Sequence, residues 1–93
     1  MVVTVVTWEL TIPGCSSLKE KRMVIRSLKD RMRKKFNVSV AETGHQDVLT
    51  RAELSAALVT SDRRFADSVI DKVDRLVDND RRALIIHTSR TDH

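Results

Sequence analysis

Apolar residues recur along this chain with two spacings, one typical of strands and one typical of helices. Residues 2–12 are rich in Val, Thr and Ile, which predicts a strand that ends at Pro13-Gly14. Residues 38–43 and 49–60 alternate apolar and polar side chains and predict two further strands. Residues 83–89 predict a fourth strand, and we expect the short tail beyond it to fray.

Two segments instead carry apolar residues at helical spacing. Ser17 and Glu20 form a capping box at the start of the first helix, and Asn37 can stop it. Its predicted apolar face consists of Leu18, Val24, Ile25, Leu28, Met32 and Phe36. The second helix is expected over residues 62–78, with Ser61 or Asp62 as its cap. Its predicted apolar face consists of Phe65, Val69, Val73 and Leu76, flanked by Ala66, Ile70 and Val77.

The resulting order, β-α-β-β-α-β, predicts an α+β ferredoxin-like sandwich in which two helices cover one face of a four-stranded antiparallel sheet. We assign residues 1–93 to this single domain, because the chain has the length of one domain and no linker divides it. The other sheet face is expected to expose small and moderately apolar residues: Val3, Val5, Thr7, Glu9, Ser39, Ala41, Glu53, Ser55, Ala57 and Ile85. This face is either solvated or the contact surface of a homodimer.

Composition limits the location of the chain. No segment approaches the roughly 20 consecutive apolar residues of a membrane span, so we expect no membrane partner. The first residues lack the basic start of a signal peptide. Cys15 is the single cysteine, so no disulfide can form within the chain. These features predict a cytoplasmic protein.

Positive charge is concentrated in the first predicted helix. Residues 18–36 contain nine basic and two acidic side chains, a net charge of +7 in a chain whose total is +4. Five of the cations follow spacings of three and four residues and share one arc beside the apolar face; we call Lys19, Arg22, Arg26, Lys29 and Arg33 the basic stripe. Stacked like charges do not help packing, whereas an RNA phosphate backbone would use them.

The basic stripe also has two interpretations that involve no RNA. It can be a solvated helix face, or it can pair with an acidic stripe on the second helix, either within the chain or between copies. The acidic stripe consists of Asp67, Asp71, Asp74 and Asp78.

The aromatic residues restrict how RNA would be bound. Trp8, Phe36 and Phe65 are the three aromatic residues, and all are predicted in the core. Sheet-face RNA readers stack bases on exposed aromatic rings. We therefore expect RNA contact through phosphates alone, with strong salt dependence and little sequence specificity.

Charged and polar residues also gather around the central hairpin: Glu42, His45, Asp47, Arg51 and Glu53. Their spacing matches no metal motif, so we predict a structural polar network rather than a metal or catalytic site. Cys15 lies before a helix start but has no clear histidine partner, and no glycine-rich phosphate loop is present. We therefore expect neither enzymatic activity nor a cofactor.

The run Ser17-Leu18-Lys19-Glu20-Lys21-Arg22 resembles the signature of the YlxP-like family of small bacterial proteins. The resemblance continues through Arg31, residues 36–42, His45-Gln46-Asp47 and residues 51–54. The family's patterned residues match Lys19, Lys21, Arg22, Arg31, Glu42, His45, Gln46, Asp47 and Arg51, whereas Gly44 stands where members often carry an acid.

This resemblance implies the ferredoxin-like fold. Because genes of this family often lie beside genes for translation initiation and ribosome maturation, it also suggests ribosomal RNA or the small ribosomal subunit as a partner. The main hypothesis is therefore a non-enzymatic RNA- or ribosome-associated accessory factor. The alternative is a self-associating protein-interaction module without nucleic-acid binding.

Overall fold

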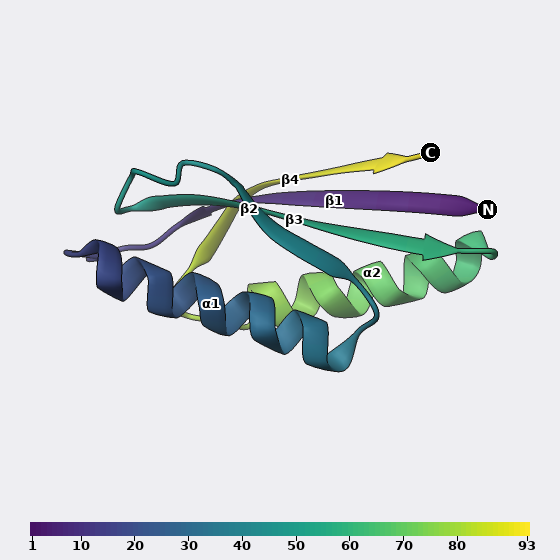
Figure 1. Cartoon of the computed structure of the whole chain (residues 1–93), viewed down its shortest axis with the longest axis horizontal. Helices are drawn as coiled ribbons and strands as arrows, with labels where there is room; N and C mark the ends of the chain where they lie inside the picture. The colour runs from purple at the N-terminus through teal and green to yellow at the C-terminus, as the bar shows by residue number, and fades with distance from the viewer.

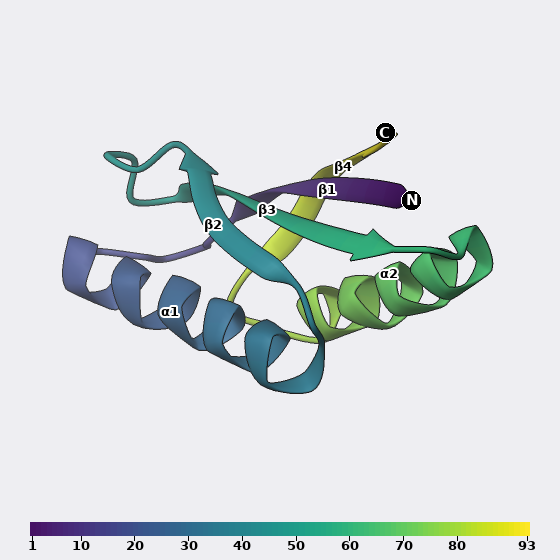
Figure 2. The ribbon, with the colours of Figure 1, turned by 45° about the vertical axis from the view of Figure 1, so that its right-hand side comes forward.

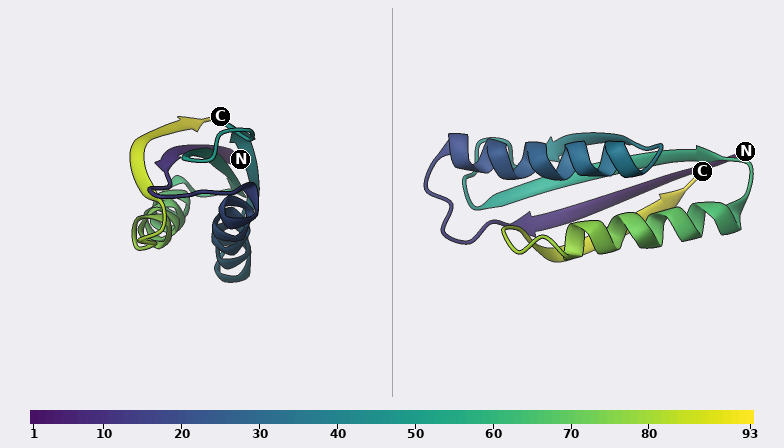
Figure 3. Two further views of the ribbon diagram at one scale, coloured as in Figure 1. Left: turned by 90° about the vertical axis from the view of Figure 1, so that its left-hand side faces the viewer. Right: turned by 90° about the horizontal axis from the view of Figure 1, so that it is seen from below.

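The computed structural model describes all 93 residues and contains four strands and two helices. Their bounds are β1 (Val2–Thr11), α1 (Leu18–Lys35), β2 (Ser39–Gly44), β3 (Arg51–Thr60), α2 (Arg63–Asp78) and β4 (Leu84–Asp92). The strands form one antiparallel sheet in the order β2-β3-β1-β4. Both helices cover the same face of this sheet (Figures 1 and 3). The fold is the predicted α+β ferredoxin-like sandwich, and neither helix is long and apolar enough to cross a membrane.

The core lies between the sheet and the helices. Alternate residues of β1 and β3 point into it, including Trp8, Leu10 and Leu54, which are completely buried. Trp8 still needs a partner for its indole N–H, and Nε1 donates to Asp74 Oδ1 of α2 at 2.8 Å. Asp74, a member of the predicted acidic stripe, therefore accepts the hydrogen bond of a buried core residue.

The first helix begins as predicted, but its buried face differs at two positions. Ser17 Oγ accepts a hydrogen bond from the Glu20 backbone N–H at 3.1 Å, which caps the helix. Leu18 is 41% exposed because it lies in the first turn, beyond the edge of the core. Lys21 occupies a buried position in the next turn.

The predicted apolar face of α2 is rotated by about one residue. The buried positions are Ala66, Ile70, Val73 and Val77, whereas Val69 and Leu76 pack at the margin. Phe65 is 57% exposed, so its assignment to the core is wrong. The completely buried Ala66 takes the sheet-facing position in this turn, and Phe65 is left on the flank of the helix.

The C-terminal tail is paired rather than frayed. β4 continues to Asp92, whose Oδ1 accepts from Thr4 Oγ1 at 2.7 Å. The backbone groups of Val3 and His93 then bond each other in both directions, at 3.1 and 2.7 Å. Ile85 pairs with buried Leu10 and packs against the core, so its assignment to the open face is also wrong; the irregularity beside Glu9 shifts the register there.

A buried carboxylate joins α1 to the turn before β4. Asp80 is 6% exposed and accepts from the guanidinium groups of Arg31 and Arg82 and from the Arg82 backbone N–H at 2.9 Å. Arg82 also donates to Ser27 Oγ of α1 at 3.0 Å. The hydrogen bonds from Arg82 and Arg31 lower the pKa of Asp80 from 3.8 to about 2.

Candidate nucleic-acid interface

The basic stripe lies along α1, and most of its charges have no partner in the chain. Lys19, Arg22, Arg26 and Lys29 make no ion pair and no side-chain hydrogen bond. Arg33 differs, because its Nη2 donates to the Val40 carbonyl of β2 at 2.7 Å. Arg33 therefore holds the outer edge of the sheet, and four cations remain free.

The acidic stripe of α2 does not neutralise these four cations within the chain. Asp67 pairs with Arg90 of β4 at 2.6 Å, and Asp74 accepts from Trp8. No ion pair joins the two stripes. The intrachain pairing considered from the sequence is therefore not formed.

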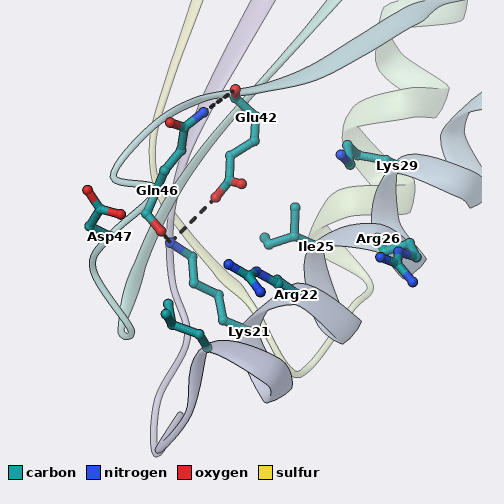
Figure 4. A pocket seen from close by; sticks show the side chains of 9 residues that line it. Lys21, Arg22, Ile25, Arg26, Lys29, Glu42, Gln46 and Asp47 are labelled. Atoms are coloured by element: carbon teal, nitrogen blue, oxygen red, sulfur yellow. Dashed lines mark hydrogen bonds and ion pairs between the residues drawn. The ribbon is translucent and has the colours of Figure 1, made fainter.

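A groove of about 240 Å³ runs between α1 and the edge strand β2; we call it the α1–β2 groove. In Figure 2, α1 lies beside β2 along this edge of the sheet. One wall carries the stripe cations Arg22, Arg26 and Lys29, and the other carries Glu42, Gln46 and Asp47 (Figure 4). Leu18, Lys21 and Ile25 complete the lining. Residues from three of the runs that carry the family resemblance, 17–22, 36–42 and 45–47, thus meet in one groove.

Lys21 fixes the loop that forms the second wall. Its side chain is 3% exposed, and Nζ donates to the carbonyls of His45 and Val48, the latter at 2.7 Å. Nζ also lies 3.4 Å from Glu42 Oε2. This role was not predicted from the sequence, although Lys21 follows the buried spacing of Ile25 and Leu28, which indicated a position facing inward.

The five residues predicted as one polar network are divided between the two faces of the hairpin. On the open sheet face, Glu9 bonds His45 Nε2 at 3.3 Å and Arg51 Nη2 at 3.2 Å. Glu53 accepts from Thr43 Oγ1 at 2.7 Å on the same face. Glu42 and Asp47 instead line the α1–β2 groove. The alternation of β2 and β3 explains the division, because Glu42 pairs with inward-facing Leu54.

The group on the open sheet face is an ion-pair cluster centred on Glu9, which was not among the five residues predicted for the network. The hydrogen bond with His45, supported by the charge of Arg51, lowers the pKa of Glu9. Gly44 borders this cluster closely, since a Cβ atom there would lie 2.8 Å from Glu53 Oε2. No three His, Cys, Asp or Glu side chains are placed to share a metal ion.

Comparison with known proteins places the whole fold in one family. The family described as "Protein of unknown function (DUF503)" matches residues 3–90. A protein of Bacillus subtilis (strain 168) described as "Uncharacterized protein YlxP" is 37% identical over 71 residues, which cover 76% of this chain and 77% of the relative. The chain therefore belongs to the DUF503 family, in agreement with the YlxP-like resemblance of its signature runs.

Proposed function

We propose that this protein is a non-enzymatic accessory factor that binds RNA, as a free strand or within the small ribosomal subunit, through phosphate contacts along α1. The observation that carries the proposal is the set of four unpaired cations, Lys19, Arg22, Arg26 and Lys29, on one helix face. Their charge is not used by the fold, so it is available to a polyanion.

The form of the surface supports a backbone contact. Arg22 and Arg26 lie one turn apart, and a guanidinium can hold phosphate oxygens with two hydrogen bonds. Four phosphates neutralised on a single strand correspond to a slope of about −3 in log affinity against log salt. Such binding is salt-sensitive and depends little on sequence.

Reversing the charge of Arg22 and Arg26 tests the proposal. We expect Arg22→Glu combined with Arg26→Glu to lower the affinity for single-stranded RNA at least about 10-fold at low salt, because two phosphate contacts become repulsive. Fluorescence anisotropy across a salt series gives both affinity and slope. Arg63→Glu with Arg64→Glu is a matched control, since these exposed cations of α2 make the same charge change without entering the groove. Equal affinities of the wild type and the stripe variant would reject the α1 interface.

Association with ribosomal particles has its own readout. Wild-type protein should co-sediment with small subunits from lysate, and ribonuclease treatment should release it. Recovery that is insensitive to ribonuclease and equal in the stripe variant would contradict an RNA-mediated association.

Self-association through the open sheet face is the second candidate function. Val3 and Val59 are paired across the strands on this face, and Val59 is 63% exposed. Beside them Val5 pairs with Ala57, so one end of the open face is apolar.

The dimer has a direct test in sedimentation. If the apolar end joins two copies, the wild type sediments as a dimer, and Ala57→Glu shifts it to a monomer by burying a charge in the contact. Ser61→Glu adds the same charge in the turn before α2 and should leave the dimer intact. A wild-type monomer at high micromolar concentration would count against this candidate.

A further inference from the structure

A second groove lies on the other flank of α1, between the end of this helix and the first half of α2; we call it the α1–α2 groove. It encloses about 270 Å³ and is lined by Lys35, Phe36, Asn37, Leu58, Phe65, Ser68, Val69 and Lys72. Figures 2 and 3 show the end of α1 close to α2 on the helical side of the sheet. The groove therefore contains two of the three aromatic side chains of the chain.

The ring of Phe65 is available to a ligand. Phe65 is 57% exposed, and Phe36 packs at the margin of the core with part of its surface accessible. Contact through phosphates alone was expected because every aromatic ring was predicted in the core. Because Phe65 is exposed, contact with a base as well as with phosphates is open to this protein.

The charges around these rings have one sign. Lys35 and Lys72 line the groove and form no ion pair, and no Asp or Glu is among the lining residues. A neighbouring hollow of about 240 Å³ shares Lys35, Phe36 and Lys72 and adds Arg75, which is also unpaired. An aromatic surface flanked only by cations matches a ligand that combines flat rings with negative charge.

We propose that the α1–α2 groove binds an unstacked base of single-stranded RNA, with the base on the Phe65 ring and the adjacent phosphates near Lys35 and Lys72. This inference rests on the proposed function and deepens it, because it makes the protein selective for single strands. Every base has a π-face, so stacking on Phe65 is tolerant of sequence. A duplex keeps its bases stacked inside and cannot offer one to the ring without unpairing.

Continuity of charge favours RNA over an acidic peptide as the occupant. The last turn of α1 carries Arg33, Lys34 and Lys35, so positive charge continues from the basic stripe to the groove. An RNA strand whose phosphates contact the basic stripe can therefore extend to Phe65. An apolar side chain of a peptide would need only an apolar surface, which Leu also provides. Phe65→Leu therefore distinguishes a peptide contact from base stacking.

The experiment compares single-stranded and duplex RNA of equal length for three substitutions at Phe65. Phe65→Ala and Phe65→Leu should both lower the single-strand affinity about 10-fold, whereas Phe65→Tyr should retain it, because only Tyr preserves the aromatic face. Duplex affinity should stay at the wild-type value in all three. Fluorescence of buried Trp8 confirms that each variant is folded; Phe65 is exposed, so its replacement leaves the core intact.

Each other result overturns the inference. Unchanged single-strand affinity in Phe65→Ala, equal losses for single strand and duplex, or full retention by Phe65→Leu would each reject base stacking, the last in favour of an apolar or peptide contact. If the Arg22/Arg26 variant loses RNA while Phe65→Ala does not, the base site fails and the α1 interface stands. If the wild type binds neither RNA, both proposals fail.

Discussion

Replacing Asp80 with Ala is expected to lower the free energy of unfolding by about 2–3 kcal/mol, because the carboxylate is buried while the two guanidinium groups that it accepts from are partly exposed. The carboxylate is buried and accepts hydrogen bonds from Arg31 and Arg82. Its removal leaves the guanidinium groups of Arg31 and Arg82 without their shared acceptor, while the hydrogen bond from Arg82 to Ser27 still joins this turn to α1. A loss of this size is a large part of the stability of a small domain, which is about 5–15 kcal/mol.

Urea unfolding followed by Trp8 fluorescence measures this loss. Asp71→Ala is the control, because Asp71 is exposed on α2 and has no ion-pair partner; its effect should stay within about 0.5 kcal/mol. If Asp80→Ala lowered the free energy of unfolding no more than the control, the ion pairs of Asp80 with Arg31 and Arg82 would contribute nothing to stability.

The same residue predicts a pH dependence. The folded-state pKa of Asp80 is lowered from 3.8 to about 2. A lowered pKa stabilises the folded state fully above the unfolded value, and this stabilisation is lost as the pH falls from about 4 through 2. The contribution is about 2 kcal/mol. The difference in stability between the wild type and Asp80→Asn should therefore shrink across this acid range. A difference that is constant with pH would contradict the lowered pKa.

Replacing Lys21 with Met should produce the second large loss, about 3–5 kcal/mol. Nζ of this buried lysine donates hydrogen bonds to the carbonyls of His45 and Val48 and forms an ion pair with Glu42. Without it, two loop carbonyls lose their donor and a half-buried carboxylate loses its cation. We expect the loop between β2 and β3 to open, with faster amide exchange at residues 45–50.

A double-mutant cycle separates the ion pair from the loop bonds. Adding Glu42→Gln to Lys21→Met should restore about 1–2 kcal/mol, because the carboxylate is no longer left uncompensated. Lys19→Met serves as the control, since Lys19 is exposed on the same helix and unpaired. Purely additive losses in the double variant would show that Lys21 acts through the loop carbonyls alone.

These two residues also mark where inference from sequence stops. Lys21 and Asp80 are charged, and a charged residue is usually placed on the surface. Each has a partner that lies far away along the chain: His45 is 24 residues from Lys21, and Arg31 is 49 residues from Asp80, although Arg82, the other partner of Asp80, is only two residues away. No local pattern contains such a distant partner. The same limit applies to Phe65, because helical spacing alone did not show that α2 presents Ala66, rather than Phe65, to the core.

The sequence by itself determined the order of the six elements, because apolar spacing and capping residues act over a few neighbours. It also determined the ferredoxin-like topology, since chain order and handedness leave few ways to cover one sheet face, and it located the basic stripe on one helix arc. Tertiary structure decided which charges remain free. It assigned Arg33 to the edge of β2 and Asp74 to Trp8, and it divided the hairpin residues between two faces. Those assignments depend on contacts between residues far apart in the chain, which arise only when the helices settle on the sheet.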